Sequence, residues 1–129
     1  GGNHHNLAHS GIGRKPDGSG LAKYDKFQGE LLTEFIKKLA ATPEANGTLL
    51  DNTLVYYGCS NSATHINSNY PLLLCGGKNL GIRYGKFHML QDRKVPLNNL
   101  YVTLLNALDA PTQKFSDSTG TLDDVLLKV

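Results

Sequence analysis

The chain has 129 residues, of which 40% are hydrophobic and 19% charged, a composition typical of a globular domain rather than of a disordered or fibrous protein. Its net charge of +2 is too small to indicate a nucleic-acid partner. No apolar run approaches the ~20 residues that a membrane-spanning helix needs, and we find no signal peptide. We expect one domain over residues 1–129, with no nucleic-acid partner and no membrane span.

The first half of the chain predicts a loop followed by a helix. Residues 1–22 are rich in Gly, Asn, Ser and His, which favour turns. From Tyr24 to Ala41 apolar side chains recur at helical spacing, which predicts an amphipathic helix. Pro43 ends it, because proline disfavours helical geometry in the preceding residue. Asn46-Gly47 is then a turn, and Asn46-Gly47-Thr48 matches the glycosylation sequon.

The second half predicts strands and another helix. Residues 53–57 and 71–75 are continuous apolar runs, typical of central strands covered on both faces. Residues 86–90 are a candidate for a third, weaker strand. Residues 96–108 keep helical spacing, and Pro96 suits the first helical turn. The core over 23–129 is therefore α/β: a few-stranded, mainly parallel or mixed sheet with two long amphipathic helices.

So few strands leave sheet edges that must be covered or paired with another chain. We therefore expect either self-association or further sequence upstream of this chain. Cys59 and Cys75 are too few for a disulfide framework. They are either two buried or half-buried free thiols, or one bridge.

Histidines are the first candidates for chemistry. His4, His5 and His9 fall within six residues, and His5 and His9 have the i, i+4 spacing found in many zinc sites. No Glu lies between them, so the general base of a metalloprotease is missing. The alternative is a solvated loop. His88 lies in an apolar segment and is interpreted as a structural residue.

The loop after the first predicted strand is the second candidate. In open α/β sheets, ligands bind at the carboxyl ends of strands, and this loop carries His65 among small polar residues that can donate to an oxyanion or ligate a metal: Ser60, Asn61, Ser62, Thr64 and Asn69. The alternative is a turn-forming loop whose side chains bond their own backbone. Cys59 with His65 is a weaker hypothesis for a nucleophile and its base.

Several blocks also resemble a known family. The segment His5-Asn6-Leu7-Ala8-His9-Ser10-Gly11 is similar to the signature of an uncharacterised, planctomycete-type bacterial family named for its His-x-x-Ser-His-His motif. The resemblance continues, in order, over most of the chain through residues 41–43, 47–51 and 54–58, then His65, Asn69 and Pro71 ahead of residues 73–77, and finally 96–100 and 115–120.

That family looks like a distant relative of the alkaline phosphatase and sulfatase superfamily. The resemblance implies a larger, exported or periplasmic protein, of which this chain is the carboxyl-terminal part of an α/β sandwich. It also implies a site of strand-end Asp and His residues that hold metal ions, with a nucleophile from an earlier part of the chain. Here Ala8 and Ser10 replace two signature residues, and Ile66, Asn67 and Ser68 stand where Asp and His are usual.

Those replacements predict weaker binding of a hard divalent cation. The remaining metal candidates, for zinc or another divalent ion, are His4, His5, His9 and His65. Two hypotheses follow. The chain is either a fragment of a hydrolase-like domain, with a histidine-based metal or anion site but incomplete for catalysis alone, or a non-catalytic binding or structural module whose site has decayed. Its partner is the upstream part of its own protein or a second copy.

Overall fold

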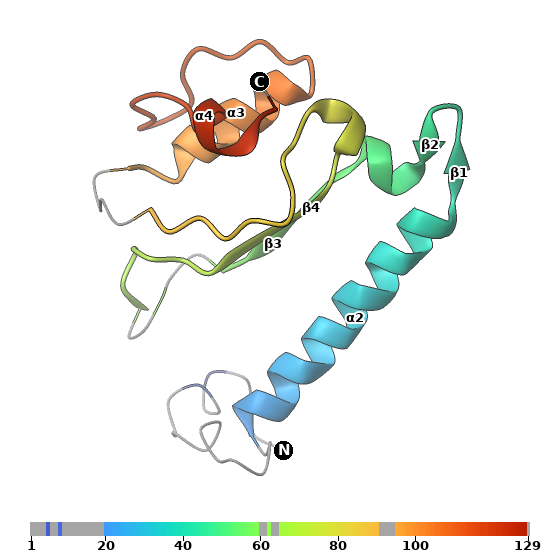
Figure 1. Cartoon of the computed structure of the whole chain (residues 1–129). Helices are drawn as coiled ribbons and strands as arrows, with labels where there is room; N and C mark the ends of the chain where they lie inside the picture. The colour runs from blue at the N-terminus through green and yellow to red at the C-terminus, as the bar shows by residue number, and fades with distance from the viewer. Residues whose placement is uncertain are drawn as a thin grey trace. The chain divides into compact units, whose positions relative to one another are not determined.

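The computed structural model describes His5, Ala8, residues 20–59, Ser62, residues 65–90 and residues 95–128. The chain separates into two compact units, Gly1–Ala41 and Thr42–Val129. Over the described residues it is a mixed α/β protein, with three helices and two small antiparallel two-stranded sheets (Figure 1). The α/β class predicted from the sequence is confirmed.

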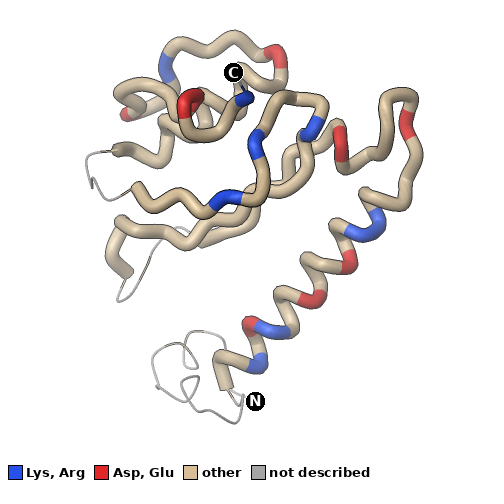
Figure 2. Tube along the Cα trace, in the orientation of Figure 1, with Lys and Arg blue, Asp and Glu red and all other residues tan. Residues whose placement is uncertain are grey.

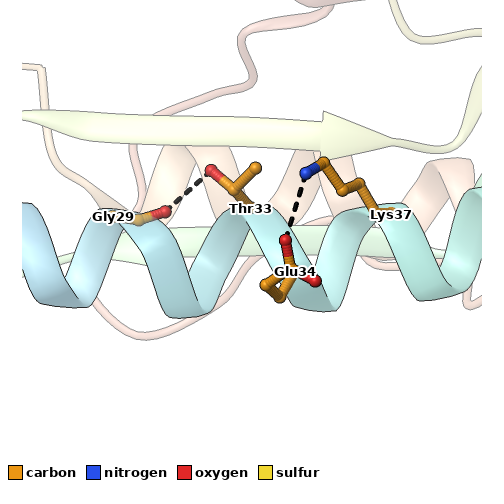
Figure 3. A network of polar contacts seen from close by, with 4 residues as sticks. All are labelled: Gly29, Thr33, Glu34 and Lys37. Atoms are coloured by element: carbon orange, nitrogen blue, oxygen red, sulfur yellow. Dashed lines mark hydrogen bonds and ion pairs between the residues drawn. The ribbon is translucent and has the colours of Figure 1, made fainter.

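The first unit contains the predicted amphipathic helix, which is confirmed as α2 (Leu21–Ala41). It begins inside the segment predicted as a loop, in which His5 and Ala8 are also helical and exposed. Charged residues of both signs are spread along α2 (Figure 2). Figure 3 shows the 3.1 Å ion pair of Lys37 with Glu34 and the hydrogen bond that the Thr33 hydroxyl donates to the Gly29 carbonyl. Pairs this exposed contribute about 0.3–0.5 kcal/mol.

The second unit opens with a small hairpin of β1 (Pro43–Glu44) and β2 (Gly47–Thr48), so the turn predicted at Asn46-Gly47 is confirmed. The 3₁₀ helix η2 (Leu49–Asn52) follows with a capping box. The Thr48 amide donates to Asp51 Oδ2 at 2.8 Å, and the Asp51 amide donates to Thr48 Oγ1 at 3.3 Å. These reciprocal bonds fix the direction in which the chain leaves the hairpin.

The two main predicted strands exist, as β3 (Leu54–Gly58) and β4 (Leu72–Gly76), but they pair antiparallel. The expectation of a mainly parallel or mixed sheet was wrong here, and the described part of the connection (Cys59, Ser62 and residues 65–71) contains no α-helix of the kind that usually joins parallel strands. Gly76 ends β4 with φ +75°, and a Cβ there would lie 2.1 Å from the Thr53 carbonyl oxygen. The fold therefore requires glycine at this point.

The expectation that both faces of these strands are covered is only half met. One face, with Leu54, Tyr56 and Leu74, packs on the core, whereas Tyr57 and Leu73 on the other face are 42% and 47% exposed. Residues 86–90 form no strand, so that prediction was wrong. The local glycine Gly85 (φ +74°) interrupts the extended chain, and every residue of 86–90 is exposed, including His88.

The second predicted helix is confirmed as α3 (Asn98–Ala107). Together with the short α4 (Asp123–Leu126), it lies on one side of the β3–β4 hairpin (Figure 1). The buried centre is Ile82, Leu100 and Leu104, against which Leu122, Leu126 and Leu127 of the tail also pack. The tail is anchored further because Ile82 and Leu127 form an antiparallel bridge.

Polar side chains of α3 hold the chain that leads to α4. Asn99 Oδ1 accepts from the Thr119 amide at 2.8 Å, and the Asn98 amide group donates to the Asp117 carboxylate. The fully buried Thr103 donates to Asp123 Oδ1. Two of the blocks that carry the family resemblance, residues 96–100 and 115–120, are therefore bonded to each other.

Candidate functional site

The connection that leaves β3 was the best predicted site by position, and its described residues are Cys59, Ser62 and 65–71. The Ser62 amide donates to the Ile66 carbonyl at 2.8 Å, and its hydroxyl is 3.3 Å from the same oxygen. Ser62 thus bonds the backbone of its own loop, as a turn-forming loop does.

Two other members of the predicted site have unusual backbone geometry. His65 has φ 61° and Asn69 has φ 54°, both in the left-handed region that non-glycine residues rarely occupy. Both side chains are exposed. Such strain tends to gather at functional sites, although Asn is among the residues that tolerate it best.

Half of the metal ligands predicted from the sequence lie outside the described residues. His4 and His9 lie outside the described residues, and so do Ser60, Asn61 and Thr64. Within residues 20–59, 65–90 and 95–128, together with His5 and Ser62, no group of three His, Cys, Asp or Glu side chains could hold a metal ion. The set of four histidines and its zinc stay a prediction.

An open groove of about 460 Å³ lies at the carboxyl end of β3. Its walls come from β3, from the chain just beyond it and from the start of α3: Tyr56, Gly58, Cys59, Leu97 and Tyr101. The sequence placed a ligand site at this strand end but did not predict the two tyrosines. In the sequence, Tyr56 and Tyr101 are simply aromatic residues within an apolar strand and an amphipathic helix. The hydrophobic pattern therefore assigns both to the core and gives no sign of a groove.

The tyrosines of the groove contact each other edge to face, with ring centroids 5.9 Å apart and planes at 71°. Burial, reinforced by a hydrogen bond with Tyr101 and by neighbouring charge, raises the pKa of Tyr56 to about 12. The phenol therefore stays neutral at physiological pH and can donate a hydrogen bond but not act as a base.

Tyr101 also borders a second open groove, of about 350 Å³, which runs along α3 to Leu108. On its far side Phe115 meets Tyr101 edge to face, with centroids 6.1 Å apart. The remaining lining is aliphatic, from Leu104 and Leu105. This surface can receive an apolar group but offers no charged side chain for catalysis.

Cys59 and Cys75 form no disulfide, so the alternative of one bridge is wrong. Cys75 is half-buried, and burial raises the pKa of its thiol, which lowers its nucleophilicity at neutral pH. Cys59 is exposed, contrary to the prediction that it is buried or half-buried. Its pairing with His65 as nucleophile and base stays a prediction.

Carboxylates are missing from the whole stretch between Asp51 and Asp92. Figure 2 shows that the β3–β4 hairpin carries no charged residue, and the charged residues from there to residue 91 are Lys78, Arg83 and Lys86. Hard divalent cations prefer carboxylate oxygens, so this stretch alone suits them poorly. A metal here would need imidazole ligands and would therefore be zinc-like.

No protein-family model, no characterised protein and no solved structure matches this chain. Within the described residues, no helix is long and apolar enough to cross a membrane. The resemblance to the His-x-x-Ser-His-His family accordingly rests on its sequence blocks alone.

Proposed function

We propose that this chain is a non-catalytic binding or structural module of an α/β protein, in an alkaline-phosphatase-like sandwich, which buries its apolar sheet face against further protein. The observation that carries the proposal is the outer face of the β3–β4 hairpin, defined here as Val55, Tyr57, Leu73 and Cys75; Val55 is buried and Cys75 half-buried, so Tyr57 and Leu73 form its exposed part. Tyr57 and Leu73 face each other across the strands and are nearly half exposed.

The chemistry of this face supports a protein partner. All four side chains are apolar or weakly polar, and neither strand carries a charged residue that would keep a free edge from pairing. In the described residues, β3 and β4 pair only with each other, so each has an open edge. The partner is the remainder of the same protein or a second copy.

The helix of the first unit adds independent support. Its apolar stripe is about half exposed at Phe27 (53%), Leu31 (51%) and Phe35 (49%). An amphipathic helix in a folded protein buries such a stripe, and isolated helices gain most of their stability from that packing.

Light scattering and binding of a hydrophobic dye test the proposal on the wild type, Leu73→Lys and Phe115→Lys. Phe115 is the matched control, since it is 45% exposed but does not belong to the outer face. We expect the wild type to self-associate or bind dye, Leu73→Lys to weaken this clearly, and Phe115→Lys to retain it. Far-ultraviolet circular dichroism confirms that both variants fold. A wild type that is monomeric and binds no dye would refute the proposal.

A second candidate function, the metal-dependent phosphatase- or sulfatase-like hydrolase, is favoured by one observation: His65 and Asn69 hold positive φ in the loop beyond β3. A bound metal would activate a nucleophile or bind a phosphoryl or sulfuryl oxygen. Metal analysis of protein purified without added metal tests it. Stoichiometric zinc that is lost in His65→Ala and His9→Ala but kept in His88→Ala would favour the hydrolase over the structural module.

A further inference from the structure

The turn between β1 and β2 combines two chemical features. Asn46 is exposed at the tip of the hairpin, and the next residue is a glycine, whose amide nitrogen no side chain shields. An asparagine side-chain amide is open to attack by the nitrogen of the following peptide, and glycine at that position removes the main steric barrier.

The fold does not allow this glycine to be replaced. Gly47 has φ +115°, and a Cβ on it would lie 2.6 Å from Asp51 Oδ2, the atom that caps η2. The capping box thus requires glycine beside Asn46.

A hydrogen bond activates the same peptide group. Asn79 Nδ2 donates to the Asn46 carbonyl at 2.7 Å. Withdrawal of electron density by this donor makes the N–H of the same peptide, on Gly47, more acidic and its nitrogen easier to deprotonate. The other asparagines with defined contacts hold their own side-chain amides in hydrogen bonds: Asn52, Asn79, Asn98, Asn99 and Asn106.

We propose that Asn46 is a modification site of the folded protein, which deamidates spontaneously and converts to isoaspartate. The Gly47 nitrogen, deprotonated by solvent, bonds to Asn46 Cγ, and the bond from Cγ to the side-chain nitrogen breaks, releasing ammonia. Water then opens the resulting succinimide. Cleavage at Cγ gives aspartate, and cleavage at the former main-chain carbonyl gives isoaspartate.

The isoaspartate disconnects the hairpin from its supports. The Asn79 amide that binds the Asn46 carbonyl also donates to Asn52 Oδ1 at 2.9 Å, and Asn52 Nδ2 donates to Glu44 Oε2 at 2.6 Å. In isoaspartate the main chain gains a methylene and this carbonyl becomes a carboxylate.

Peptide mapping by mass spectrometry after incubation of the folded chain in mildly alkaline buffer tests the site. The internal control is Asn67, which is exposed and precedes Ser68. We expect the peptide with Asn46 to convert several-fold faster than the peptide with Asn67, with isoaspartate as the larger product. Equal rates, or an intact Asn46 when Asn67 has reacted, would overturn the proposal.

The structural consequence has its own comparison. Asn46→Asp introduces the charge without the extra methylene, so we expect it to unfold at nearly the wild-type denaturant concentration. The isoaspartate form, separated by ion exchange, should unfold at a lower concentration. Identical midpoints for the two forms would show that the hairpin does not depend on this carbonyl.

Discussion

Thr103 offers the sharpest test of how the second unit is held together. It is fully buried, and its hydroxyl donates to Asp123 Oδ1 and accepts from the Leu122 amide, both at 2.7 Å. Thr103→Val keeps the shape but leaves both partners unpaired. An unpaired buried partner costs about 1–3 kcal/mol, and Asp123 is only half-buried, so we expect a loss of about 3 kcal/mol in the free energy of unfolding.

Urea and thermal unfolding followed by circular dichroism measure this loss, which corresponds to a melting temperature lower by about 15 °C in a unit of this size. Thr112→Val is the control, because that half-buried hydroxyl donates only to the Ala110 carbonyl two residues away; we expect it to lose about 0.5–1 kcal/mol. Thr103→Ser should recover most of the loss. If Thr103→Val is no worse than Thr112→Val, the hydroxyl does not hold the tail.

Three further outcomes follow from single positions. Gly76→Ala should lower the free energy of unfolding, measured by urea titration, by more than about 2 kcal/mol, because its Cβ would clash with the Thr53 carbonyl. Gly29→Ala, whose Cβ would have nothing within 4 Å, should instead stabilise α2 by about 1 kcal/mol. The reverse order of the two variants would refute this account of the glycines. Hydrogen bonds from Thr48 lower the pKa of Asp51 in the folded protein. The stability contributed by the ionised Asp51 carboxylate is therefore present above pH ~4 and is lost as the pH falls through this lowered pKa. Asp51→Asn should flatten this acid limb in pH-dependent unfolding, and an unchanged limb would contradict it. Burial raises the pKa of Tyr56 to about 12, so the stability that its neutral phenol contributes is present below pH ~10 and is lost as the pH rises toward 12. Tyr56→Phe should remove one phenol that ionises late in a titration followed by absorbance. A titration curve identical to that of the wild type would count against the burial of Tyr56.

The helices and the two main strands were predictable because each has a strong local pattern. The apolar spacing of α2 and α3 and the apolar runs of β3 and β4 fix the type of element before any packing. The direction of strand pairing was not predictable in this way, because continuous apolar runs are read as parallel strands only by association with covered sheets. The better signal was the sequence between Gly58 and Leu72, whose small polar residues show no helical spacing, whereas parallel strands are usually joined by a crossover helix.

The tail was harder, because its order depends on partners distant in sequence. Residues 114–122 have the composition of a loop, and α4 is only one helical turn. Buried side chains of α3, such as Asn99 and Thr103, fix this stretch through hydrogen bonds across about 20 residues of chain. A periodicity analysis counts Asn99 and Thr103 as the polar face of the helix and assigns them to solvent.

These contacts also bear on the two proposed functions. The blocks at 96–100 and 115–120, which carry part of the family resemblance, are bonded to each other through Asn98–Asp117 and Asn99–Thr119. Their residue types are therefore explained by architecture without any catalytic role. An inherited activity would need the imidazoles of His4, His5, His9 and His65, and of these four only His65 belongs to the second unit. Because the stretch around it has no carboxylates, the structural module requires fewer assumptions than the hydrolase. Zinc analysis with His65→Ala beside His88→Ala decides between them.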